Sequence, residues 1–173
     1  MNEPQANQQE KVAALRREAE RIEEDATYSS KSHFNAAQVW ERCHYWLGIP
    51  ATAFAAIAGA ALFKSYAEVG SALALLASLL AGLMTFLKPN ERAAMHRVAA
   101  GQFLALRNDA RIFREVELLQ VELLGKLPER LKALSATRNE LNQKSPSVPR
   151  SAFDSARKGI EEGEATHKVD KEG

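Results

Sequence analysis

The single cysteine of this chain, Cys43, stands next to a histidine, His44. A thiolate activated by an imidazole base is a common nucleophilic arrangement in enzymes. The surrounding segment is expected to be helical, however, and adjacent side chains on a helix point about 100° apart. The two groups are therefore badly placed to act as nucleophile and base. We interpret them as the flank of an interfacial helix.

No other residues form a recognisable catalytic, metal or cofactor motif. His33, His96 and His167 are scattered without ligand spacing, and the chain has no phosphate-binding loop, dinucleotide fingerprint or nucleophile elbow. His96 lies between Arg92 and Arg97, a set that suits either contact with a phosphate group or a solvated basic flank. We therefore expect no enzyme and no cofactor. One cysteine also excludes an internal disulfide.

Three hydroxyl groups recur every seven residues, at Ser71, Ser78 and Thr85. On a helix they form one stripe, which is typical of a pore lining and equally of an ordinary packing seam. Small residues recur every four positions in the same segment and in the one before it, a pattern that lets helix backbones approach closely. The rows are Gly70, Ala74, Ser78 and Gly82, and Ala51, Ala55 and Gly59.

These residues lie in two stretches without charge, residues 43–63 and 69–87. Each stretch is apolar all round and reaches about 28–31 Å as a helix, one hydrocarbon thickness. Residues 64–68 form a short connection. We predict a transmembrane hairpin over 43–87, with spans at about 45–63 and 69–87. The alternative is a buried hairpin in a soluble bundle, which a 173-residue chain could hardly cover.

Positively charged residues predict the orientation of the hairpin. Lys31, Arg42, Lys88, Arg92 and Arg97 flank the spans on the terminal sides, whereas Lys64 alone lies in the loop. The excess of cations marks the cytoplasmic side. We therefore expect a two-pass membrane protein with both termini in the cytoplasm.

The remaining residues predict cytoplasmic helices that pack as a bundle or coiled coil. Residues 1–42 carry one apolar stripe, interrupted by Ser29, Ser30 and Ser32, and residues 88–144 carry another after a helix start capped by Asn90. Pro128 begins a new helical segment. Residues 145–173 hold a break at 145–149, a short helix near 151–162 and a polar tail. The stripes are Val12, Leu15, Ala19, Ile22 and Ala26, and Ala99, Phe103, Leu106, Ala110, Phe113 and Val116, extended by Leu119, Leu123 and Leu127. The formal net charge of +1 argues against nucleic acid as a partner.

Several segments resemble the SLATT family, the SMODS and SLOG-associating two-transmembrane effector domains of bacteria. The first span opens with Trp46-Leu47-Gly48-Ile49-Pro50 after Trp40. The second leaves with Thr85-Phe86-Leu87-Lys88-Pro89-Asn90-Glu91-Arg92, followed by His96, Leu106-Arg107 and, later, Ser145-Pro146 before Ala152-Phe153. The resemblance covers about residues 30–160. It implies a conflict-system effector that forms pores when a partner in trans makes or senses a nucleotide-derived signal.

Three functions follow from these patterns. The first is a membrane effector that forms homo-oligomers in the lipid bilayer through its small-residue rows and permeabilises the inner membrane in antiviral defence. The second is a membrane anchor or scaffold without a pore, which recruits a cytoplasmic partner through its coiled-coil helices. The third is a soluble helical adaptor.

Overall fold

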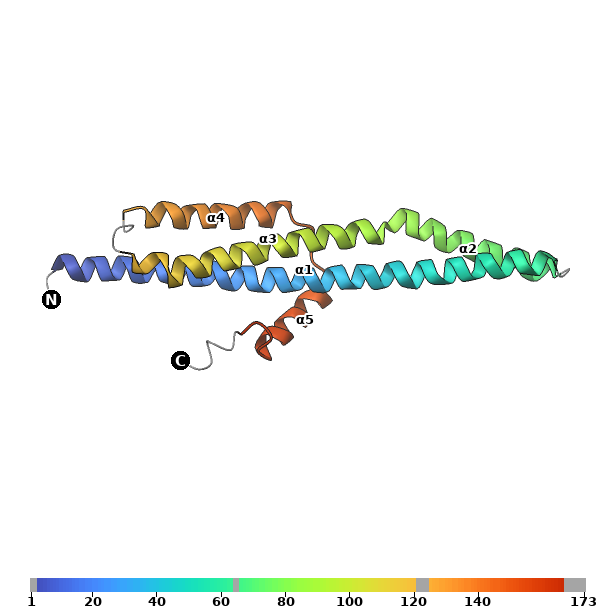
Figure 1. The fold of residues 1–173 in the computed structure, drawn as a ribbon, viewed down its shortest axis with the longest axis horizontal. Coiled ribbons are helices and arrows are strands. Elements are labelled where there is room, and N and C mark those ends of the chain that lie inside the picture. The colour runs from blue at the N-terminus through green and yellow to red at the C-terminus, as the bar shows by residue number, and fades with distance from the viewer. Residues whose placement is uncertain (1–2, 64–65, 121–124, 167–173) are drawn as a thin grey trace. The chain divides into compact units, whose positions relative to one another are not determined.

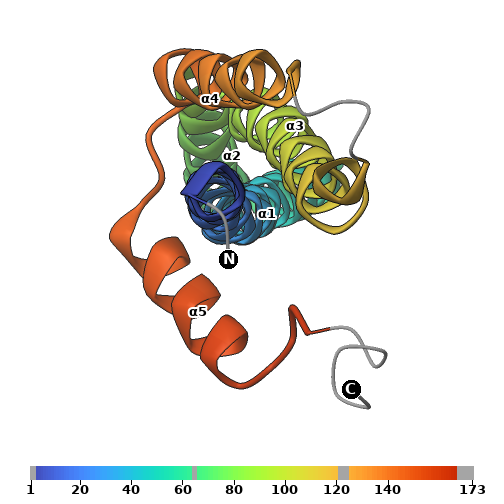
Figure 2. The same cartoon turned by 90° about the vertical axis from the view of Figure 1, so that its left-hand side faces the viewer.

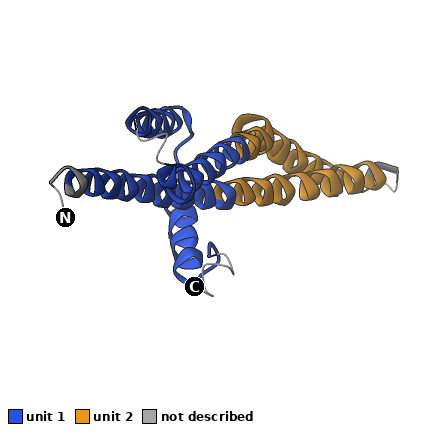
Figure 3. Cartoon of the chain, turned by 60° about the vertical axis from the view of Figure 1, so that its left-hand side comes forward, with its two compact units in different colours: residues 1–35, 96–173 blue, residues 36–95 orange. Residues whose placement is uncertain are grey.

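The computed structural model describes residues 3–63, 66–120 and 125–166, and every regular element in these ranges is helical (Figure 1). The prediction of an all-α protein is therefore confirmed. The chain divides into two compact units: unit 1 comprises residues 1–35 and 96–173, and unit 2 comprises residues 36–95 (Figure 3). The elements are α1 (Glu3–Phe63), α2 (Ala67–Leu87), α3 (Pro89–Glu115), the 3-10 turn η1 (Glu117–Leu119), α4 (Leu127–Lys144) and α5 (Arg150–Glu161).

Unit 1 is built around an apolar core shared by α1, α3, η1 and α4, three of which are seen nearly end-on in Figure 2. The predicted stripes supply most of this core, because residues spaced three and four apart fall on one helix face. Val116 and Leu119 are exposed instead, and Leu118 is buried in place of Leu119. Leu15 and Leu131 pack against its edge. Its buried members are Ala19, Ile22, Ala26, Phe103, Leu106, Ala110, Phe113, Leu118, Leu127, Leu134 and Leu141.

Polar contacts fix α1 and α3 in an antiparallel register within unit 1. The Ser30 hydroxyl donates to the Ala100 carbonyl over 2.9 Å, and the Arg114 guanidinium pairs with Glu23 at 3.1 Å. Residues with lower numbers on α1 therefore contact residues with higher numbers on α3. The Glu23–Arg114 pair is partly buried, so it is less screened by solvent than a surface pair.

Helix α5 packs on α1 through small residues and an aromatic contact. Ala152, Ala156 and Gly159 are buried, and the rings of Tyr28 and Phe153 lie 6.4 Å apart. The Asn35 amide donates to the Ala152 carbonyl over 3.3 Å. On the other side of the core, Arg138 of α4 pairs with Asp25 of α1 at 3.1 Å. All of these contacts lie in unit 1.

Unit 2 contains the end of α1 from Ala36, the whole of α2 and the first turns of α3. Lys88 ends α2 in the left-handed conformation with φ 46°, and its N–H donates to the Met84 carbonyl. Pro89, which is buried, then begins α3. Proline suits a first helical position because the N–H it lacks would have had no partner there. The expectation that Asn90 caps this helix was therefore wrong.

The three serines expected to loosen the chain near residue 30 do not interrupt α1. Ser29, Ser30 and Ser32 are all helical, and Ser30 and Ser32 are buried. Serine disfavours a helix mainly when its hydroxyl competes for the local backbone. Here the Ser30 hydroxyl instead bonds to α3, which removes that competition.

Several other helix boundaries differ from those that the sequence predicts. The long second stripe does not continue on one helix, since α3 ends at Glu115 and α4 begins at Leu127 with proline in its first turn. Leu123 and the connecting residues Lys64 and Ser65 lie outside the described residues, as does the polar tail from His167. The break at residues 145–149 is confirmed. The final helix covers Arg150–Glu161 rather than 151–162.

Candidate functional site

Helix α2 presents large apolar side chains that unit 2 leaves uncovered. It begins the one stretch of the described residues that is long and apolar enough to cross a membrane, with a mean hydropathy of 2.0 and 6% of its most apolar window buried. A helix of this composition normally lies in a protein core or in lipid. Its exposed apolar residues include Val69, Leu75, Leu76, Leu79, Leu83 and Phe86. The first predicted span, near 45–63 in α1, lies outside this stretch and stays a prediction.

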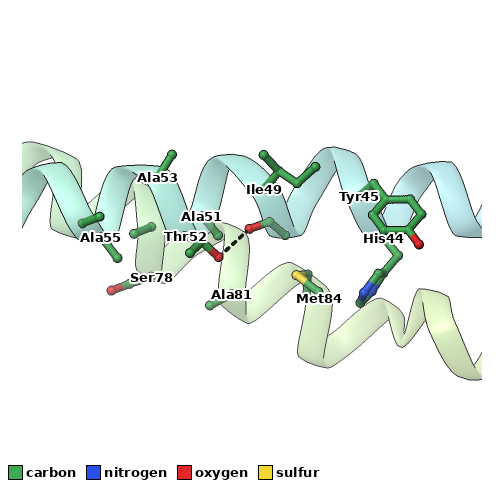
Figure 4. A pocket seen from close by; sticks show the side chains of 13 residues that line it. His44, Tyr45, Ile49, Ala51, Thr52, Ala53, Ala55, Ser78, Ala81 and Met84 are labelled. Atoms are coloured by element: carbon green, nitrogen blue, oxygen red, sulfur yellow. Dashed lines mark hydrogen bonds between the residues drawn. The ribbon is translucent and has the colours of Figure 1, made fainter.

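An apolar groove of about 1050 Å³ runs between α1 and α2 within unit 2 (Figure 4). Small side chains leave it open, since Ala51, Ala55 and Ala81 contribute only a methyl group each to its wall. The helices meet at one end of the groove, where Met84 would lie 3.4 Å from a Cβ added to Gly48. The groove therefore depends on small residues, which are alanines on both helices and Gly48 on α1.

The three hydroxyl groups of the predicted stripe are exposed and bond to their own helix. Ser71 donates to Ala67, Ser78 to Ala74 and Thr85 to Ala81, each to the carbonyl four residues earlier at 2.8–3.0 Å. Such bonds satisfy the hydroxyl proton in an apolar environment. The lone pairs of each oxygen still allow it to accept a bond. The geometry is therefore compatible with a pore lining and with a packing seam.

The small-residue rows are partly buried within unit 2 and partly open. Gly70 is buried, as are Ala58 and Ala77 beside the rows. Ala74 and Gly82 are exposed, and a Cβ added to Gly82 or to Gly59 would meet nothing within 4 Å. The open part of the α2 row is thus free to approach another helix.

The membrane-flanking cations have different environments. Arg42 is exposed, and Lys88 is exposed and pairs with Glu91 at 3.2 Å. The Arg92 guanidinium lies 4.8 Å from the centre of the Trp40 ring, a cation–π contact within unit 2. Arg97 is exposed and lies in the part of α3 that belongs to unit 1, which begins at His96.

The structure gives the cysteine–histidine pair no catalytic geometry. Cys43 is half-buried, and His44 turns its ring edge toward the Tyr45 ring, 5.7 Å away between centres. His44 Nδ1 has no hydrogen-bond partner among the described residues. Likewise, no group of three or more potential metal ligands forms within the parts of the chain that the structure describes.

Unit 1 brings together two histidines that the sequence analysis left apart. His33 of α1 and His96 of α3 are each 3% exposed, and their Nδ1 atoms lie 2.9 Å apart. The His33 ring also stacks on Phe103, with 5.5 Å between ring centres and 13° between planes. At this distance one Nδ1 must carry a proton and donate a hydrogen bond, and the other Nδ1 must accept that bond through its lone pair.

Burial makes His33 a weak base. Loss of solvent and the neighbouring His96 lower the pKa of His33 from 6.5 to about 4. Both causes disfavour the charged form of His33, since burial removes its hydration and a positive charge on His96 would repel it. At neutral pH this ring is therefore neutral.

A signal for this pair was present in the sequence. His33 continues the α1 stripe seven residues after Ala26, and His96 precedes Ala99 by three and Phe103 by seven on the α3 stripe. Both histidines thus occupy core positions of predicted helices. The spacing of metal ligands in the sequence does not reveal this pair, because the two histidines are 63 residues apart and meet only when α1 packs on α3.

No protein-family model, curated protein or solved structure matches this chain.

Proposed function

We propose that this protein is a membrane effector of a bacterial conflict system that forms homo-oligomers and permeabilises the inner membrane. In this proposal residues 43–87 cross the bilayer twice, and both termini lie in the cytoplasm. A partner protein in trans makes or senses the nucleotide-derived signal, as the resemblance to the SLATT family implies. The carrying observation is α2, which begins the apolar stretch Ala67–Leu119, whose most apolar window has a mean hydropathy of 2.0 and is 6% buried.

Energetics favour insertion of α2 over exposure to water. Residues 69–87 contain nine strongly apolar side chains. At about 0.3–0.6 kcal/mol each they favour insertion by roughly 3–5 kcal/mol. Exposed apolar side chains in the preceding part of α1, Trp46, Ile49 and Ile57, support a second span that inserts with this partner.

The distribution of cations supports the proposed orientation of the hairpin in the membrane. The open part of the small-residue row on α2 supports association between copies of the chain. Arg42 and Lys88, both exposed, lie at the two ends expected on the cytoplasmic side. The open row at Ala74 and Gly82 allows close helix contact between copies, which a pore requires because one hairpin encloses no channel.

A bulky side chain in the open row is expected to abolish pore activity. Gly82→Leu and Ser78→Leu should remove toxicity on induced expression while membrane insertion stays intact, because added bulk prevents close approach of a second helix. Toxicity is followed by colony counts and membrane potential by a voltage-sensitive dye, at equal protein levels.

Ala72→Leu is the matched control for these variants. Ala72 is exposed on α2 and lies off the small-residue row, so the same added bulk should leave toxicity unchanged. Toxicity that persists in both row variants would contradict the role of this row.

A second candidate is an anchor without a pore, favoured by the extensive core of unit 1. It predicts that exchanging residues 43–87 for an unrelated hairpin keeps phage protection. The native operon with and without the exchange separates the two functions: protection without depolarisation supports the anchor, and loss of both supports the pore.

A further inference from the structure

The two buried histidines are the least expected polar groups in unit 1. Ser30 and Ser32 are the other buried polar residues in this region, whereas Ala36 on α1 and Phe103 on α3 are buried and apolar. An aromatic or leucine side chain in place of either histidine would serve packing alone. The contact joins α1 to α3 at a point where both rings are almost fully removed from water. Its chemistry is that of a proton site.

The geometry limits how many protons the pair can hold. In the neutral pair, one Nδ1–H donates to the lone pair of the other Nδ1. A first added proton can go to the far nitrogen of the donor ring and leave this bond in place. A second proton must occupy the accepting Nδ1, which removes the bond and places two cations within hydrogen-bonding distance. The closed contact is therefore incompatible with double protonation.

The surroundings of His33 offer no compensation for a positive charge. A cavity of about 370 Å³ lies beside the ring, and none of the described residues that line it is charged. Apart from His33 itself, the one titratable group among them is the Tyr28 hydroxyl, while Ser32 Oγ is buried without a partner. The lining comes from α1, α3, α4, the 145–148 segment and α5: Tyr28, Ser29, Ser32, His33, Phe103, Asn142, Ser145, Pro146, Ser147, Val148 and Phe153.

Several charged groups near His33 along the chain have partners elsewhere. Lys31 pairs with Glu164, and Arg107 donates to the Ala165 carbonyl. Arg97 follows His96 directly on α3. On α5, Asp154 lies between Arg150 and Arg157, 3.8 Å from each. No described carboxylate lines the cavity beside His33 to stabilise an imidazolium.

We propose that the His33–His96 contact is a proton-operated latch, which holds α1 against α3 while the neutral pair has gained at most one proton and releases them when both rings are imidazolium cations. This inference goes beyond the proposed function and depends only on the packing of unit 1. Acidification of the compartment that holds unit 1 is the stimulus it would detect.

The sign of the effect follows from linkage. The pKa of His33 is about 4 in the folded protein and about 6.5 when the chain opens. Between these values the open state binds more protons, so falling pH favours opening. With these two values, the closed-to-open ratio at pH 5 is about 30-fold lower than at pH 7.5. The stabilisation is complete above pH 6.5 and is lost as pH falls toward 4.

Hydrogen exchange tests this latch on the full chain in detergent micelles. Protection of residues 26–35 and 96–103 is compared at pH 7.5 and pH 5, after correction for the intrinsic exchange rate. The native chain should lose about 30-fold of protection in both segments. His33→Gln with His96→Gln should lose less than 3-fold, because the amides hydrogen-bond without titrating. His96→Gln alone, which keeps one buried imidazole, serves if the double variant does not fold.

Glu23→Gln is the control, since it removes a carboxylate that also joins α1 to α3, at Arg114. It should keep the 30-fold loss. An equal loss in the native chain and in the histidine variants would overturn the latch. Micromolar binding of zinc alone at pH 7.5 that requires both histidines would overturn it as well, by assigning the pair to a metal. Neither result depends on membrane insertion, so failure of the latch and failure of the proposed function are distinguishable.

Discussion

Leu79→Arg in the middle of α2 is expected to move the protein out of the membrane fraction. A leucine at the centre of a span favours insertion by about 0.3–0.6 kcal/mol, whereas an arginine opposes it by about 2.5–3.5 kcal/mol. The change of roughly 3–4 kcal/mol cancels most of the 3–5 kcal/mol that favours insertion of residues 69–87. Sodium carbonate extraction followed by immunoblotting measures the ratio of membrane-embedded to extracted or aggregated protein, which should fall by about two to three orders of magnitude.

Val98→Arg is the matched control for this variant. Leu79 and Val98 are both 61% exposed, but Val98 lies on α3 in unit 1 and outside the predicted spans. An arginine there should leave the protein resistant to carbonate. If the native chain were extracted by carbonate, or if both variants behaved like the native chain, the proposed membrane insertion of α2 would fail.

The helices of unit 1 could be predicted because their information is local. Ala19, Ile22 and Ala26 repeat at a spacing of three and four, as do Phe103 and Leu106, and this repetition marks the buried face whatever the partner. The break at residues 145–149 is equally local, since proline restricts both itself and the residue before it. Such local rules therefore predict which segments are helical and which face of each helix is buried.

The meeting of His33 and His96 could not be predicted in the same way, because it depends on the register between two helices. The residues are 63 positions apart, and sliding α3 by one turn would place other side chains opposite His33. Register is fixed by tertiary contacts such as Ser30 with Ala100 and Glu23 with Arg114. The bond from Ser30 to Ala100 also explains why Ser30 does not end α1.

The stripe of Ser71, Ser78 and Thr85 marks another limit of sequence reasoning. Spacing places the three hydroxyls on one face, and the structure adds that each donates to its own helix. Because this bond forms equally well beside water and beside lipid, it does not separate a pore lining from a seam. Only contacts between copies of the chain distinguish the two.

Phe113→Ala is expected to destabilise unit 1 more than any surface change. The Phe113 side chain is 0% exposed and belongs to the core shared by α1, α3 and α4. Removal of a buried phenyl ring costs about 3–5 kcal/mol through lost burial and the cavity left behind. A domain of this size is stabilised by only about 5–15 kcal/mol. Hydrogen exchange of residues 15–26 in detergent should therefore show a loss of protection of at least 100-fold at pH 7.5.

The residue before Phe113, Ile112, provides the control, because it lies on the exposed face of α3 whereas Phe113 lies on the buried face. Ile112 is 46% exposed, so Ile112→Ala should change protection by less than about 5-fold, in keeping with a surface substitution of up to about 1 kcal/mol. Residues 15–26 belong to α1, so the measured loss would report packing between helices rather than a local change in α3. Equal effects of the two substitutions would mean that α1 does not pack on this face of α3. The register that brings His33 to His96 would then be wrong as well, since both contacts arise from the same antiparallel pairing.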